Sequence, residues 1–141
     1  MGDQPGARPP GPDRPAAGVL RRCMFAPMST GVPQPGVEFL WWRECPSWER
    51  ALAELREEMK ALGLDPQSVD VREIDTDDAA EREEFVGSPT IRIDGRDMQP
   101  PDGDPVGLNC RVYRLRDGRV SPLPDRADVR DALAEAMREA R

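Results

Sequence analysis

The chain of 141 residues contains no histidine. Histidine is the usual general base near neutral pH and a common metal ligand, so its absence excludes His-activated nucleophiles and His-containing metal sites. Cysteine is scarce as well, with only Cys23, Cys45 and Cys110 at wide spacing. This pattern makes neither the disulfide framework of a small secreted domain nor a zinc ribbon. Catalysis must then use thiols, carboxylates, Tyr113, Lys60 or the backbone, and no metal or cofactor is expected.

Long apolar runs are also missing. None approaches the length of about 18 residues that a membrane span needs, and segment 18–20 runs directly into Arg21 and Arg22, unlike a signal peptide. Residues 1–36 hold four Arg and two Asp of a chain with net charge −7, which leaves −9 on residues 37–141. An acidic surface repels nucleic acid and anionic lipid. We therefore expect a cytoplasmic protein without nucleic-acid or membrane partners.

Residues 1–36 differ in composition from the rest of the chain. They contain eight of the 16 prolines and six of the 12 glycines, with few apolar residues and no helical or strand periodicity. Such a segment cannot bury enough apolar surface to fold. The composition predicts a disordered leader over 1–36 and one folded domain over 37–141. Met24 and Met28 leave open a start codon assigned too early, in which case Cys23 is irrelevant.

The remaining sequence alternates between strand and helix patterns. Residues 37–42 are strand formers with both faces largely apolar, as in a central buried strand. A helix with an apolar stripe is expected over 46–62, with Pro46 at its first position, and a second strand around 69–74. The opposite side of that helix, including Glu54, Glu57 and Glu58, is expected to be solvated.

A strand, a helix and a strand over so few residues imply a right-handed parallel crossover. Four further elements follow, namely a short helix, a hairpin turning at Asp94-Gly95, a second short hairpin and a last helix, at 75–86, 90–99, 110–121 and 125–140. The order β-α-β-α-β-β-α, with an insertion before the last helix, predicts an α/β fold with a mixed central sheet.

Cys45 lies where the first strand ends and the first helix begins. The amides of a first helical turn have no intrahelical acceptor and the helix dipole is positive there, so a thiolate is stabilised and the thiol pKa falls. In open α/β sheets, ligands bind at the carboxyl ends of the strands. The sequence therefore predicts a reactive, partly exposed thiol. The alternative is a half-buried cysteine that only packs beside the helix.

Two separated motifs resemble the thioredoxin-like superfamily. One is Cys45-Pro46, and the other is Gly87-Ser-Pro-Thr90, which is similar to that family's cis-proline signature. The resemblance covers 37–99 and 125–140 and implies a three-layer α/β/α sandwich, with a cis bond before Pro89 that packs against Cys45. The alternative for this proline is an ordinary trans turn residue. The resemblance also implies a set of substrate-binding residues: Pro46, Trp48, Ser88, Pro89 and Thr90.

The chain departs from the family pattern at position 48, where Trp48 stands in place of the second cysteine of a Cys-x-x-Cys pair. A thiol that resolves a mixed disulfide on Cys45 must then come from elsewhere, and Cys110 is the candidate. A strand that returns antiparallel after Gly95 would bring residues 107–110 over Cys45. The alternative is that Cys110 is a buried strand residue facing the core. We interpret Tyr113 as an ordinary strand residue without a role in the chemistry.

Taken together, the motifs Cys-Pro, Gly-Ser-Pro-Thr, Asp-Gly-Arg-Asp and Gly-Leu-x-Cys-Arg-Val-Tyr resemble a group of short bacterial thioredoxin-like proteins. Some members have selenocysteine at the first cysteine, and some are labelled alkylmercury lyase. The resemblance implies thiol redox chemistry of the thiol-disulfide oxidoreductase type. The Cys45 thiolate would attack a disulfide or other soft electrophile of a protein or small molecule, and Cys110 or an external thiol would resolve the product.

Two other functions stay open. Organomercurial cleavage, or binding of a thiophilic metal, would use Cys45 and Cys110 as ligands, and cleavage would need an acid such as Asp94, Asp97 or Asp102. A non-catalytic binding module would keep Cys45 without chemistry and use a groove lined by the neighbouring tryptophans, Trp41, Trp42 and Trp48.

Overall fold

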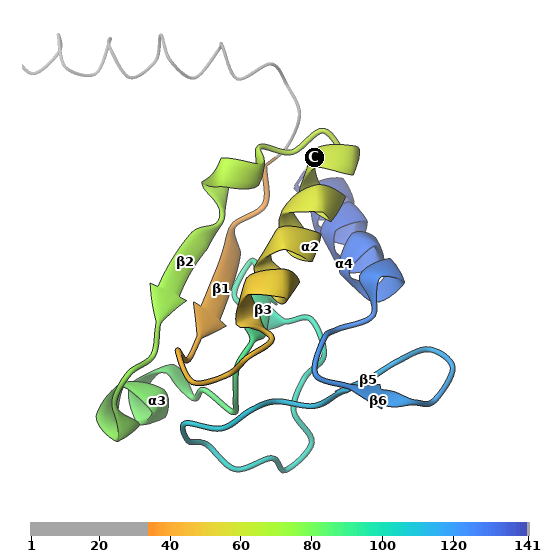
Figure 1. The fold of residues 1–141 in the computed structure, drawn as a ribbon. Coiled ribbons are helices and arrows are strands. Elements are labelled where there is room, and N and C mark those ends of the chain that lie inside the picture. The colour runs from red at the N-terminus through yellow and green to blue at the C-terminus, as the bar shows by residue number, and fades with distance from the viewer. Residues whose placement is uncertain (1–33, 141) are drawn as a thin grey trace, which may run out of the picture. The chain divides into compact units, whose positions relative to one another are not determined.

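The computed structural model describes residues 34–140 (Figure 1). Apart from its last three residues, the predicted leader lies outside this part of the chain, as does Cys23. The described residues contain one four-stranded sheet in the order β2-β1-β3-β4. Its strands are β1 (Val37–Trp41), β2 (Asp70–Glu73), β3 (Thr90–Ile93) and β4 (Arg96–Asp97). β1 pairs with β2 in parallel, whereas β3 runs antiparallel to β1 and β4. The predicted α/β fold with a mixed sheet is confirmed.

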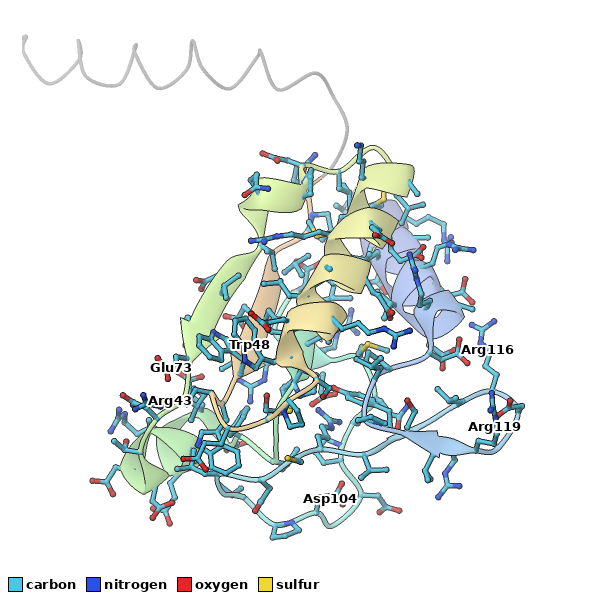
Figure 2. The ribbon with its side chains drawn as sticks, viewed as in Figure 1. Arg43, Trp48, Glu73, Asp104, Arg116 and Arg119 are labelled. Atoms are coloured by element: carbon cyan, nitrogen blue, oxygen red, sulfur yellow. The ribbon has the colours of Figure 1, made fainter. Side chains whose placement is uncertain are left out.

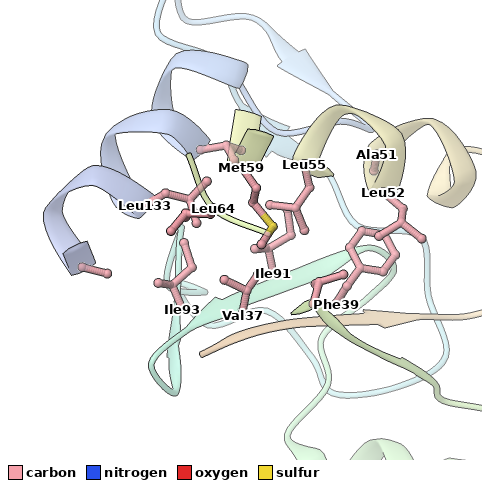
Figure 3. Close-up of a cluster of buried hydrophobic side chains, with 13 residues drawn as sticks. Val37, Phe39, Ala51, Leu52, Leu55, Met59, Leu64, Ile91, Ile93 and Leu133 are labelled. Atoms are coloured by element: carbon pink, nitrogen blue, oxygen red, sulfur yellow. The ribbon is translucent and has the colours of Figure 1, made fainter. Parts of the chain in front are cut away.

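Two long helices, α2 (Trp48–Ala61) and α4 (Arg126–Glu139), lie side by side over one face of the sheet (Figure 1). They enclose the main core, in which Val37 and Phe39 of β1 meet the apolar stripe of α2 (Figure 3). The expected stripe of α2 is confirmed by its buried members, which are Leu52, Leu55 and Met59. Fully burying a side chain of this size contributes about 2 kcal/mol.

The other face of the sheet carries a thinner layer. Side chains alternate along a strand, so Leu40 points away from the main core and packs with Phe85 near the short helix α3 (Asp77–Glu83). The rest of this face is polar. Arg72 contacts Glu83 at 2.7 Å and Glu38 at 3.1 Å, and these half-buried ion pairs cover the strands in place of an apolar helix face.

The backbone conformations of the connecting segments agree with the turn-forming residues in them. Asp94 and Gly95 both have positive φ, 53° and 83°, which is the backbone of a tight two-residue hairpin turn between β3 and β4. The predicted second hairpin is present as a separate two-stranded sheet of β5 (Tyr113–Arg114) and β6 (Val120–Ser121). A single 3-10 turn (Pro66–Ser68) precedes β2. None of the described helices has both the length and the apolar character needed to cross a bilayer.

Two expectations about α2 are wrong. The helix begins at Trp48 and not at Pro46, because Pro46 and Ser47 form a turn ahead of it. Glu58 is not solvated but only 3% exposed. The N-terminal part of α4 packs over this side of α2, and Arg126 and Arg130 donate to the Glu58 carboxylate at 2.9 and 2.7 Å.

Candidate functional site

Cys45 lies in the turn that connects the carboxyl end of β1 to the start of α2. This turn is at the lower end of the sheet in Figure 1. Its N–H donates to the Trp42 carbonyl at 3.0 Å, which closes the turn. Ser47 occupies the N-cap position of α2, but its side chain makes no capping hydrogen bond. Instead, the Ser47 hydroxyl lies 3.3 Å from Cys45 Sγ. The local sequence therefore directs a hydroxyl toward the sulfur.

The segment before β3 supplies the second wall of the site. The Ser88–Pro89 peptide bond is cis, in agreement with the expectation for Pro89. The Cys45 thiol donates to the Ser88 carbonyl at 3.3 Å. Ser88 is fully buried, and its hydroxyl has no hydrogen-bond partner. This hydroxyl is free to donate to the sulfur when the thiol ionises and the carbonyl contact is lost.

Cys110 belongs to a segment that runs beside the same loop. Ser88 and Cys110 form an isolated parallel bridge, in which the Ser88 N–H donates to the Asn109 carbonyl at 2.8 Å and the Arg111 N–H donates to the Ser88 carbonyl at 2.9 Å. Cys110 is exposed, so the alternative that it is a buried core residue is wrong. Cys45 and Cys110 are both free thiols.

The two thiols have opposite pKa shifts. Burial alone would raise the pKa of Cys45, but hydrogen bonds that its thiolate accepts from the Ser47 hydroxyl, the Ser88 hydroxyl, the Ser47 amide and Cys110 hold it below its ordinary value. The pKa of Cys110 is raised, first by burial and then by the charge of the neighbouring Cys45 thiolate. One sulfur therefore ionises first while its neighbour keeps its proton, which is the arrangement needed for a nucleophile and a resolving thiol.

The expected partial exposure of Cys45 is wrong, because this residue is only 2% exposed. Pro46 is exposed beside it. Of the other residues expected to bind substrate, Ser88, Pro89 and Thr90 are buried. The Thr90 hydroxyl donates to the Gly87 carbonyl at 2.6 Å and so is committed to the loop itself.

The tryptophans do not line a common groove. Trp48, at the first turn of α2 (Figure 2), stacks on Trp41 with ring centroids 3.9 Å apart, and both pack against the main core. Trp42 packs against the separate cluster near α3. The groove expected for a binding module is therefore absent from these three residues, because successive residues of a strand face opposite sides.

Two residues that hold the site together were missed in the sequence. Arg111 is 7% exposed and donates to both carboxylate oxygens of Asp97, at 2.8 and 3.0 Å, and to the Thr90 hydroxyl at 3.2 Å. Tyr113 is fully buried and donates to the Pro89 carbonyl at 2.5 Å. The guanidinium lies 4.6 Å from the centre of the Tyr113 ring. Both residues fasten the Cys110 segment to the Pro89 loop. Their only sequence signal is the motif Gly-Leu-x-Cys-Arg-Val-Tyr.

Gly87 permits this close approach of the two segments. Its φ of +144° favours glycine, and a Cβ there would lie 2.9 Å from Arg111 Cβ and 3.1 Å from Arg111 backbone atoms. Because real Cβ atoms do not approach other atoms this closely, any side chain at position 87 would push the Cys110 segment away from Ser88.

In the described part of the chain, Asp104 lines a cleft beside Cys110, but two of the three candidate acids are held elsewhere. Asp97 is engaged by Arg111, and Asp94 accepts from the Gly36 N–H at 2.8 Å in the β3–β4 turn. Within residues 34–140, no group of three or more His, Cys, Asp or Glu side chains is arranged to hold a metal ion. Comparisons of this chain with protein-family models, curated proteins and solved structures found no match.

Proposed function

We propose that residues 37–141 form a thioredoxin-like domain that carries out thiol redox chemistry at Cys45. The strand order β2-β1-β3-β4 and helices on both faces of the sheet support the fold assignment. The cis Ser88–Pro89 bond beside the cysteine at the start of α2 supports the assignment of the site. Free thiols also suit a reducing compartment, so we propose a cytoplasmic location.

The reaction begins with the Cys45 thiolate. Its sulfur attacks one sulfur of a disulfide, forms a mixed disulfide and releases the other sulfur as a thiolate, which takes up a proton. The hydroxyls of Ser47 and Ser88 stabilise the thiolate before the attack. Cys110 then loses its proton and attacks Cys45 Sγ, which releases the second substrate thiol and leaves a Cys45–Cys110 disulfide. An external dithiol reduces this disulfide and is itself oxidised.

A single observation carries this proposal. The sulfur of Cys45 lies 3.3 Å from both the Ser47 hydroxyl and the Ser88 carbonyl, next to a second free thiol, and its pKa is lowered despite its burial. A buried cysteine that only packs would have apolar neighbours and a raised pKa.

Peptide mapping after oxidation tests the proposal. The full chain is treated with hydrogen peroxide or with a low-molecular-weight disulfide and digested without reductant, and we expect a Cys45–Cys110 peptide. Cys45→Ser and Cys110→Ser should each abolish that peptide, whereas Cys23→Ser should leave it unchanged. An alkylation profile over pH should give a lower pKa for Cys45 than for Cys110. If Cys45 titrates as an ordinary or raised thiol and no such disulfide forms, the domain is a binding module without thiol chemistry.

Organomercurial cleavage is less well supported. Two adjacent thiols suit a soft metal, but the hydrogen bonds of Cys45 involve hydroxyl and carbonyl groups and no carboxylic acid that would protonate the leaving carbon. Release of a hydrocarbon from an organomercurial would favour this second function over the first.

A further inference from the structure

Ser88 has both of its backbone hydrogen-bonding groups turned toward a segment of its own chain. Its N–H donates to Asn109 and its carbonyl accepts from Arg111, on either side of Cys110. We call residues 109–111 the covering strip. It passes the same end of the sheet as the turn between β1 and α2 (Figure 1). The strip makes the hydrogen bonds that a short strand added to an edge would make.

The edge that the covering strip occupies is the one next to the reactive sulfur. The Ser88 carbonyl accepts from the Cys45 thiol as well as from the Arg111 N–H. A polypeptide that presents a disulfide to a thiol gains affinity and alignment by pairing its backbone with such an edge. Here the N–H and the carbonyl of Ser88 are already hydrogen-bonded to the covering strip, and Cys45 is 2% exposed. A second strand can pair with Ser88 only if the covering strip leaves.

Buried polar contacts hold the covering strip in place. Arg111 and Asp97 form an ion pair whose side chains are 6% and 13% exposed. Two residues beyond the strip, the Tyr113 hydroxyl donates to the Pro89 carbonyl. Displacing the strip would break these contacts, including the charge-assisted hydrogen bonds of a mostly buried ion pair. The covering strip is therefore held in place by buried contacts and forms one wall of the site.

From these contacts we infer that Cys45 acts on soft electrophiles of only a few atoms, and that the covering strip excludes disulfides carried by polypeptides. The inference rests on the proposed function and narrows its substrate class. A small electrophile needs no backbone pairing with Ser88. It needs only access to one sulfur atom, with Cys110 beside it to complete the reaction.

A hydroperoxide is the simplest substrate of this class. The Cys45 thiolate takes the terminal peroxide oxygen, the O–O bond breaks, and the departing alkoxide or hydroxide takes a proton, so that Cys45 becomes a sulfenic acid. The Cys110 thiol then attacks this sulfur, a water molecule leaves, and a Cys45–Cys110 disulfide forms. The two sulfurs together lose two electrons, which reduce the peroxide to an alcohol or water. An external dithiol restores both thiols.

The test compares four probes of increasing size on the reduced full chain: hydrogen peroxide, hydroxyethyl disulfide, glutathione disulfide and insulin. The rate of loss of the Cys45 thiol is followed by quenching and peptide mass spectrometry. Arg111→Lys loosens the strip, since lysine cannot make the two-pronged contact with Asp97. Tyr113→Phe removes the hydroxyl and keeps the ring. Arg119→Lys is the matched control, because Arg119 is exposed and pairs with Asp117 on the β5–β6 hairpin.

We expect the wild type and Arg119→Lys to react with hydrogen peroxide and hydroxyethyl disulfide but not measurably with insulin. In Arg111→Lys and Tyr113→Phe, the rates with glutathione disulfide and insulin should rise about tenfold as the open strip becomes more populated, while the peroxide rate changes little. If circular dichroism shows that Arg111→Lys does not fold, Tyr113→Phe carries the test.

Insulin reduction by the wild type at a rate near that for hydroxyethyl disulfide would overturn the inference. The inference would also be overturned if Arg111→Lys and Tyr113→Phe changed the reaction rates of Cys45 with all four probes by the same factor. Failure of the proposed function has a different signature, because Cys45 would then be inert toward all four probes in every folded variant.

Discussion

At the residue scale, the lowered pKa of Cys45 depends on a serine that does not cap its helix. A side-chain cap stabilises a helix by about 1 kcal/mol, and Ser47 sits at the position where it would provide one. Its hydroxyl contacts Cys45 Sγ instead. This contact is the largest of those that lower the pKa of the thiol. Ser47 therefore lowers the pKa of the thiol and does not cap the helix.

The variant Ser47→Ala is expected to raise the pKa of Cys45, because the thiolate loses a hydrogen-bond donor. Below that pKa the alkylation rate with iodoacetamide should fall about fivefold, corresponding to one hydrogen bond of about 1 kcal/mol. The helix content measured by circular dichroism should not change. Ser68→Ala is the control, since the exposed Ser68 hydroxyl donates to the Asp65 carbonyl, in the loop between α2 and β2. An unchanged rate in Ser47→Ala would mean that the hydroxyl does not stabilise the thiolate.

Gly87 gives a second prediction at this scale. Gly87→Ala should destabilise the protein by about 3 kcal/mol, since it combines an unfavourable φ with overpacking against Arg111. Gly118→Ala is the matched control, because Gly118 also has a positive φ of +93° but nothing within 4 Å of its added Cβ. That variant should cost about 1 kcal/mol. Urea unfolding measures both. Equal losses in the free energy of unfolding for the two variants would show that a side chain at position 87 does not clash with the covering strip.

At the element scale, α2 and α4 are joined by a buried carboxylate. The pKa of Glu58 is lowered, first by the hydrogen bond from Arg130 and then, against the opposing effect of burial, by Arg126. A carboxylate whose folded-state pKa is depressed stabilises the fold at every pH above its unfolded-state pKa. That contribution is lost as the pH falls through the lower, folded-state value.

Glu58→Gln should therefore destabilise the protein by about 2 kcal/mol at pH 7, which is typical of hydrogen bonds to a charged group. The difference from the wild type should shrink below the ordinary pKa of 4.5 and vanish in stronger acid, where Glu58 is protonated in both states. Urea unfolding at several pH values measures this. Glu57→Gln is the control, because the Glu57 side chain is 64% exposed. A difference that persists unchanged in acid would contradict the role of the Glu58 charge.

The elements themselves could be predicted because their signals are local. The strand formers of β1 and the apolar stripe of α2 are visible within a few residues of each other, and Asp94-Gly95 fixes its own turn. Glu58 looked solvated because its partners on α4 lie 68 and 72 residues away. Nothing within one helix shows where another helix will pack.

The same limit applies to the site. Cys45 and the Pro89 loop were found because each carries a short motif of its own. Arg111 and Tyr113 were missed because their partners, Asp97 and Pro89, stand 14 and 24 residues away along the chain. The exposure of Cys45 was also wrong, since the strip that covers it belongs to the insertion before the last helix, whose position no local pattern determines.

At the scale of the whole molecule, the two thiols face different surroundings. Cys45 is buried beneath the covering strip, whereas Cys110 is exposed and helps to line a shallow cleft of about 260 Å³ together with Val86 and Val112. Val112 is 62% exposed, and the polar residues Asp104 and Asn109 complete the lining, so the accessible sulfur lies in a cleft of mixed character. A small electrophile and a large reductant would therefore meet different sulfur atoms.

This difference in exposure predicts which of the two sulfurs a reductant attacks. In the proposed reaction, a protein dithiol would reach the exposed sulfur of Cys110 in the Cys45–Cys110 disulfide, and Cys45 would depart as the thiolate. Departure in this direction is also favoured chemically, because the thiol with the lower pKa is the better leaving group. A protein reductant whose resolving cysteine is replaced by serine should be trapped on the oxidised chain, and peptide mapping should find it bonded to Cys110. Cys23→Ser serves as the background, so that only two sulfurs compete. A mixed disulfide on Cys45 would show that the covering strip opens before reduction.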